Sequence, residues 1–102
     1  MIYNKLVRDK IPEIIKNDGK TVYTHKAHDK EYFEKLKDKL LEEVREYIKS
    51  PCKEELADIL EVVYALCDVM KISKGDLEKF RELKEKDKGK FLERIILEKV
   101  NE

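Results

Sequence analysis

Hydrophobic residues recur three or four positions apart along most of the chain, which is the spacing of helices. The longest such stripe runs from Asp29 to Lys49 and predicts one long helix, with Asp29 as its candidate N-cap. Ser50 and Pro51 interrupt the pattern, and a second long helix is expected to begin at once, with Ser50 as its cap, and to run to about Lys71. The connection is short, so these two helices should form an antiparallel hairpin.

Shorter helices are predicted on both sides of this hairpin. Residues 8–17 carry isoleucines at helical spacing, and this helix should stop near Gly19. After the hairpin, Ser73 and Asp76 have the spacing of a capping box and open a charged helix that should end at Gly89. The chain is therefore expected to be mostly helical.

Two segments lack a clear helical stripe. Residues 20–27 include Val22, Tyr23 and Thr24 and favour an extended conformation, whereas the pattern of residues 91–100 fits either an extended segment or a helix. No repeat or glycine- and proline-rich linker divides the chain. We therefore predict one all-α domain, residues 1–102, consisting of a helical hairpin with flanking short helices.

The composition suggests that one copy of this chain does not supply a complete core. Charged residues make up 45% of the sequence and hydrophobic residues 41%. From Leu56 to Met70, however, apolar residues surround much of the predicted second long helix, more than a helix at the edge of a small domain needs. We therefore expect a homo-oligomer, at least a dimer, in which hairpins from two subunits form a four-helix core.

Charge and hydropathy exclude several classes of partner. The 23 basic residues are balanced by 23 acidic ones, so there is no overall positive field to hold a nucleic acid, and none is expected as a partner. No apolar run has the length of a membrane span or a signal peptide. Cys52 and Cys67 show no metal-binding or disulfide spacing. The expected protein is soluble and cytoplasmic, with no membrane partner.

Acidic residues gather on both sides of the predicted hairpin turn. On a helical wheel, Glu55 and Asp58 share the apolar face of the second long helix, while Glu43 and Glu46 lie near the apolar stripe of the first. Two carboxylates about 5 Å apart repel each other by roughly 3 kcal/mol at an effective dielectric constant of about 20. Four converging carboxylates therefore need cations, and oxygen ligands without histidine suit Mg²⁺, or Mn²⁺, better than zinc.

An alternative interpretation treats these acids as an ordinary solvated surface. Glu42 and Glu43 have Arg45 and Lys39 three and four residues away, the spacing of ion pairs within a helix. On this interpretation the chain is a non-catalytic helical interaction module. The two carboxylates of the second helix are harder to explain in this way, because exposed acids have no reason to lie on an apolar stripe.

At these acids the sequence resembles the MazG-like superfamily of all-α nucleoside triphosphate pyrophosphohydrolases, which also includes phosphoribosyl-ATP pyrophosphohydrolase. The similar segment, residues 40–66, reads LLEEVREYIKSPCKEELADILEVVYAL. Its acidic signature stands at Glu42, Glu43, Glu46, Glu55 and Asp58. The opening YNKLVRDKIPEII, residues 3–15, and the closing KGKFLERIIL, residues 88–97, are similar to a small house-cleaning branch of these enzymes.

This resemblance implies Mg²⁺-dependent hydrolysis of a nucleoside triphosphate, which need not be a canonical one, to the monophosphate and pyrophosphate. Glu43, Glu46, Glu55 and Asp58 would be the metal ligands, and Glu42 and Glu43 the catalytic candidates that orient or deprotonate water. An alternative within the same fold is hydrolysis of phosphoribosyl-ATP. The resemblance also implies an active site built within a dimer.

Substrate phosphates need cationic partners, and both ends of the chain offer them. The candidates are Lys5, Arg8, Lys10, Lys84, Lys88 and Arg94. The resemblance singles out three of these, Arg8, Lys10 and Lys88.

Overall fold

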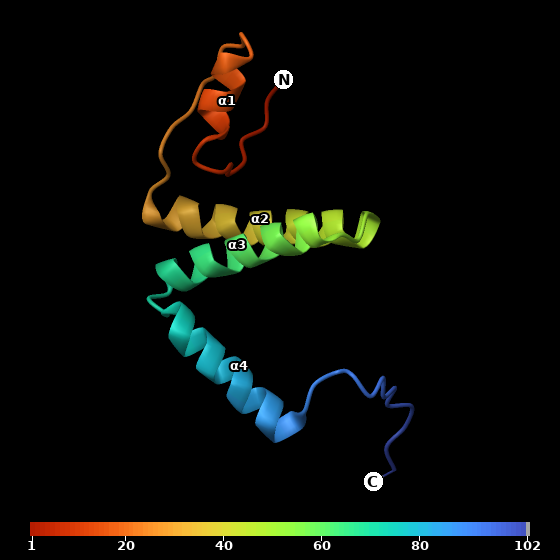
Figure 1. The fold of residues 1–102 in the computed structure, drawn as a ribbon. Helices are drawn as coiled ribbons and strands as arrows, with labels where there is room; N and C mark the ends of the chain where they lie inside the picture. The colour runs from red at the N-terminus through yellow and green to blue at the C-terminus, as the bar shows by residue number, and fades with distance from the viewer. Residues whose placement is uncertain (102) are drawn as a thin grey trace. The chain divides into compact units, whose positions relative to one another are not determined.

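The computed structural model describes residues 1–101, and over that range the chain forms four helices and no strand (Figure 1). The helices are α1 (Ile11–Asn17), α2 (Asp29–Lys49), α3 (Lys53–Val69) and α4 (Lys74–Lys88). The all-α prediction is therefore confirmed. The chain divides into two compact units, Met1–Lys71 and a second that begins at Ile72. The single-domain assignment stays a prediction.

Helices α2 and α3 form the predicted hairpin and lie side by side (Figure 1). The apolar stripes of the two helices face each other and bury Leu36 of α2 with Val62 and Cys67 of α3. Leu36 is only 2% exposed. This small apolar core fixes how the two helices face each other, and therefore which of their polar side chains meet.

The turn of the hairpin differs in detail from the prediction. Ser50 does not cap α3, because it is the C-cap of α2 and donates its backbone N–H to the carbonyl of Glu46. Pro51 is not the first residue of α3 either, since Cys52 is extended, with φ −160° and ψ 165°, and takes the N-cap position. The antiparallel reversal thus uses non-helical backbone between the two helices, and α3 begins two residues after Pro51.

Two other helix ends also differ from the prediction. Asp29 is the first residue of α2 rather than its N-cap, which is the extended His28. Asp29 still places a negative charge in the first turn, where the helix dipole favours it. The C-terminal end of α3 is the second difference. This helix stops at Val69 instead of Lys71, because Lys71 adopts the left-handed conformation with φ 60°.

The C-terminal end of α1 and both ends of α4 follow the sequence signals, whereas α1 begins at Ile11 and not at the predicted residue 8. Helix α1 ends before Gly19, which adopts φ 83°. The Ser73 side chain caps α4 as predicted: its Oγ accepts a hydrogen bond of 3.0 Å from the backbone N–H of Asp76. Gly89, with φ 87°, ends α4 at a backbone conformation that other residues rarely adopt.

The two segments without a clear helical stripe remain outside the helices. Residues 20–27 and 91–100 form neither a helix nor a strand, although residues 91–93 include a turn. Among the described residues, no helix has the length and apolar character needed to cross a membrane.

Candidate metal centre

Three carboxylates from the two helices of the hairpin converge on one point. One oxygen from each of Glu43, Glu55 and Asp58 lies within 4.8 Å of the other two. Glu43 precedes the turn on α2 by about as many residues as Asp58 follows it on α3, so the antiparallel packing brings them opposite each other. We call these three side chains the acidic triad.

The acidic triad is partly shielded from water, which makes its like charges costly. Glu43 is only 9% exposed, and Glu55 and Asp58 are half-buried. The Oε2 atom of Glu55 is buried and has no hydrogen-bond partner among the described residues. Burial, the neighbouring Glu43 and repulsion from the acids around it raise the pKa of Glu55 above its usual value. A buried carboxylate oxygen without a donor is a position that a cation can satisfy.

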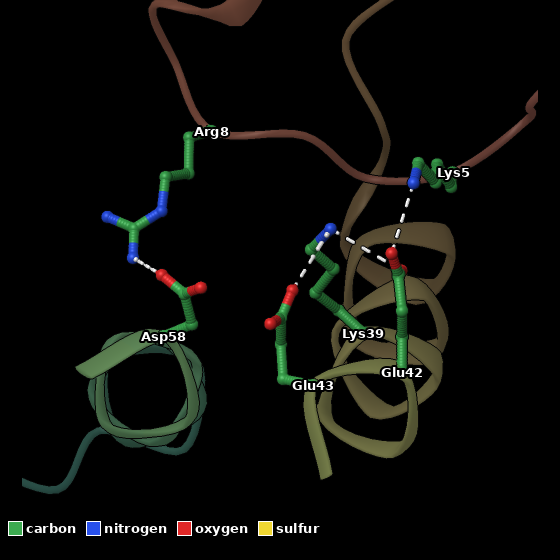
Figure 2. A network of polar contacts seen from close by, with 6 residues as sticks. All are labelled: Lys5, Arg8, Lys39, Glu42, Glu43 and Asp58. Carbon is green, nitrogen blue, oxygen red and sulfur yellow. Dashed lines mark hydrogen bonds and ion pairs between the residues drawn. The ribbon is translucent and has the colours of Figure 1, made fainter. Parts of the chain in front are cut away.

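Two of the three carboxylates already have a cation on their outer side (Figure 2). Arg8 Nη2 donates a hydrogen bond of 2.7 Å to Asp58 Oδ1, and Lys39 Nζ lies 3.5 Å from Glu43 Oε1. Within residues 1–101, no ion pair is formed by Glu55. Glu55 is therefore the member of the triad whose charge is least compensated.

Glu42 lies beside the acidic triad but outside it. Its Oε1 accepts a hydrogen bond of 3.0 Å from Lys5, and its Oε2 accepts one of 3.4 Å from Lys39 (Figure 2). Partial burial raises the pKa of Glu42, but the hydrogen bond from Lys5 and the charge of Lys39 outweigh that effect and hold the pKa below its usual value. Glu42 is therefore a stable anion whose two oxygens are both bound.

Glu46 is the one predicted metal ligand that does not converge with the others. Its side chain is exposed, and no oxygen of it belongs to the triad found among the described residues. Its charge still contributes to raising the pKa of Glu55. Glu46 sits one helical turn nearer the hairpin turn than Glu43 and farther from the apolar stripe of α2. Its assignment as a ligand stays a prediction.

The N-terminal segment, residues 1–10, reaches both helices of the hairpin. Lys35 of α2 donates a hydrogen bond of 2.8 Å to the backbone carbonyl of Asn4. Lys5 then reaches Glu42 on α2, and Arg8 reaches Asp58 on α3. Figure 2 shows this segment passing over the carboxylates, with Lys5 and Arg8 pointing down to them.

These cations include residues whose role the sequence did not reveal. Lys39 was visible in the sequence only as an ion-pair partner of Glu43, not as a bridge between Glu42 and the triad. The pairing of Arg8 with Asp58 joins residues 50 positions apart, for which helical spacing carries no signal.

The other predicted phosphate-binding residues lie on different parts of the chain. Lys10 is the N-cap of α1, directly after the N-terminal segment. Lys84 and Lys88 belong to α4, and Arg94, with φ 58°, follows it in the second unit. Their phosphate contacts stay predictions.

The donor set of the acidic triad fits a hard divalent cation. It offers carboxylate oxygens only, which suit Mg²⁺ or Mn²⁺. The buried, unpartnered oxygen of Glu55 is an acceptor that such an ion would satisfy. No protein-family model, no curated protein and no solved structure matches the chain.

Proposed function

We propose that this chain is a Mg²⁺-dependent nucleoside triphosphate pyrophosphohydrolase that forms a monophosphate and pyrophosphate. One observation supports the proposal most strongly: the acidic triad brings three carboxylate oxygens within 4.8 Å, and a buried oxygen of Glu55 has no donor. Glu43, Glu55 and Asp58 would hold the ion, and Glu46 is a further candidate from the same face of the hairpin. Mn²⁺ would be an acceptable substitute for Mg²⁺.

The proposed chemistry needs positioning and charge neutralisation more than a nucleophilic side chain. When bound, Mg²⁺ would neutralise phosphate charge and lower the pKa of a coordinated water. Of the two residues predicted to handle water, Glu42 has a lowered pKa and both oxygens bound to lysines. Glu42 is therefore better suited to hold Lys5 and Lys39 in place, which leaves Glu43 as the candidate for orienting water.

Cations beside the acidic triad support the phosphate-binding part of the proposal. Lys5 and Arg8 pair with Glu42 and Asp58, so two cations lie next to the proposed metal site. A guanidinium has five N–H donors, more than one carboxylate can use, so Arg8 can also bind a phosphate. The proposed roles of Lys10, Lys84, Lys88 and Arg94 in phosphate binding rest on the sequence resemblance.

The proposal is tested by measuring pyrophosphate release from a panel of canonical and modified nucleoside triphosphates with Mg²⁺. We expect release from at least one triphosphate and its loss in Glu55→Gln and Asp58→Asn. Both variants should also bind Mn²⁺ much more weakly in isothermal titration. Glu54→Gln is the matched control, because Glu54 is the exposed neighbour of Glu55 and should be replaceable without loss.

The same panel separates this proposal from its rivals. Phosphoribosyl-ATP belongs in the panel, and selective hydrolysis of it would assign the chain to the histidine-pathway reaction. Unchanged Mn²⁺ affinity in both triad variants would reject the metal site. Absence of pyrophosphate release from every nucleotide would instead favour a non-catalytic interaction module.

We also propose that the working unit is a homo-oligomer, at least a dimer, in the cytoplasm, where nucleoside triphosphates are abundant. Large apolar residues of the hairpin are left exposed: Leu41, Ile48, Leu56, Leu60 and Met70. Leu56 and Leu60 follow each other on one face of α3 and are 51% and 47% exposed. A second hairpin packed on this face would complete a four-helix core.

A further inference from the structure

Arg8 connects the irregular N-terminal segment to the acidic triad. It lies in no helix, and its guanidinium donates a hydrogen bond that reaches across to Asp58 of α3, 50 residues away. Its guanidinium side chain is 54% exposed, so burial alone does not hold it there. The contact is instead made at 2.7 Å between a charged donor and a charged acceptor, which is the strong class of hydrogen bond.

In each of the two ion pairs of the acidic triad, the cation contacts one of the two oxygens of the carboxylate. Arg8 takes Oδ1 of Asp58, and Lys39 takes Oε1 of Glu43. In Figure 2 the other oxygen of each carboxylate is turned toward the facing helix, so that the inner oxygens of Asp58 and Glu43 face each other. The cations thus lie on the outside and do not bind the inner oxygens.

We propose that Arg8 is a positioning residue, which holds Asp58 with its inner oxygen toward Glu43 and so prepares it to bind the divalent cation. This inference rests on the metal site of the proposed function. Groups that hydrogen-bond to a metal ligand and orient it contribute roughly 10- to 100-fold to metal affinity. Arg8 would act in this way on Asp58, although it touches no metal itself.

Because Arg8 belongs to the N-terminal segment, docking of this segment onto the hairpin should be coupled to metal binding. Asn4 and Lys5 attach the segment to α2, and Arg8 carries it across to α3. If docking of the segment strengthens metal binding through Asp58, metal binding must strengthen docking by the same factor. The metal should therefore protect residues 1–10, although none of them is a ligand.

A competing electrostatic effect has the opposite sign. The positive charge of Arg8 also repels a divalent cation, so removing it would by itself tighten metal binding. Solvent and salt screen this repulsion, because the side chain is more than half exposed. If Arg8 were only a counter-ion that occupies Asp58 in place of the metal, its removal would raise the metal affinity. The sign of the change therefore distinguishes a positioning residue from a competing ion.

The first test is isothermal titration of Mn²⁺ into wild type, Arg8→Gln and Arg8→Lys. We expect Arg8→Gln to weaken Mn²⁺ binding by about 10-fold or more. Arg8→Lys should recover most of the loss, since the described contact uses one donor. The matched control is Arg45→Gln, which removes the same charge from an exposed position on α2 and should change the affinity little.

The second test measures hydrogen exchange of the peptide that covers residues 1–10, with and without Mg²⁺. In the wild type we expect Mg²⁺ to slow exchange there, and in Arg8→Gln we expect that protection to be lost. This readout does not depend on catalysis, and circular dichroism of each variant checks that the helices persist.

Each outcome of these tests decides the proposal. Equal or tighter Mn²⁺ binding by Arg8→Gln would overturn it, as would an Arg8→Lys affinity no better than that of Arg8→Gln. Unchanged Mg²⁺ protection of residues 1–10 in Arg8→Gln would also overturn it. If the wild type bound no metal at all, the proposed metal site would fail, which is a separate result from metal binding that is insensitive to Arg8.

Discussion

At the scale of single residues, Glu55 is the position where charge and burial conflict most. Glu43 and Asp58 each have a cation beside them, whereas Glu55 has like-charged neighbours and a buried oxygen without a donor. Glu55 is therefore easier to protonate in the folded, metal-free chain than in the unfolded chain. That is an energetic cost to the fold at neutral pH, and it is a cost that a bound cation would remove.

We predict that Glu55→Gln makes the metal-free protein more stable at neutral pH, or leaves it equally stable. The raised pKa means that the folded state binds the proton of Glu55 more tightly than the unfolded state. This contribution to stability is present below the unfolded pKa, near 4.5, and is lost as the pH rises through the raised pKa. The advantage of the Gln variant should thus grow with rising pH and then level off.

Thermal unfolding of both proteins in EDTA, at a series of pH values from about 4 to 8, measures this difference. Adding Mg²⁺ should then stabilise the wild type more than the variant, because only the wild type keeps all three ligands. A Gln variant that is clearly less stable than the wild type in EDTA at neutral pH would mean that the charge of Glu55 stabilises the folded protein through an ion pair.

At the scale of elements, the ends of the hairpin helices and the ends of α4 are determined by different interactions. The limits of α2 and α3 are set where the chain reverses, and Ser50 shows this by closing α2 instead of opening α3. Helix α4 instead has a side-chain cap at one end and a left-handed glycine at the other. Its residues are otherwise mostly exposed, so local signals matter more for it than for the hairpin.

We predict that Ser73→Ala destabilises α4 by about 1 kcal/mol, because the backbone N–H of Asp76 loses its acceptor. Ser73→Asp should keep most of the stability, since a carboxylate also caps well and suits the helix dipole. Hydrogen exchange of the α4 amides is the measurement. Equal exchange rates in Ser73→Ala and the wild type would show that α4 does not depend on its cap.

At the scale of the whole molecule, the chain leaves much of its apolar surface uncovered. In the hairpin only Leu36, Val62 and Cys67 are buried apolar residues. In contrast, Leu56 and Leu60 of α3 are about half exposed, with the exposed Ile48 near the end of α2. Soluble monomers rarely keep contiguous apolar patches on the surface, which is the physical argument for a second subunit.

We predict a sedimentation-equilibrium mass of at least twice 12.2 kDa at micromolar concentration. Leu60→Lys should shift the protein toward the monomer, because it places a charge within the proposed apolar interface. Glu61→Lys is the matched control, since Glu61 is the adjacent exposed residue on the polar face of α3 and should leave the assembly intact. A wild type that sediments as a 12.2 kDa monomer with full pyrophosphohydrolase activity would contradict the dimer.

The sequence by itself determined the features that depend on local periodicity and local hydrogen bonds. The apolar stripe of residues 29–49 appears as α2, with the N-cap one residue earlier than predicted, and Ser73 and Gly89 mark the two ends of α4. The same periodicity put Glu55 and Asp58 together on the apolar face of α3. These properties follow from positions a few residues apart, which a helix brings together in a fixed way.

Only the tertiary structure decided which of the acids meet and which cations reach them. It brought Glu43 to the acidic triad and left Glu46 outside, a difference that depends on how α2 and α3 face each other. It also joined Arg8 to Asp58 and Lys5 to Glu42, across 50 and 37 residues. Such contacts depend on how separate segments pack against one another, and no repeating pattern along the chain records that packing.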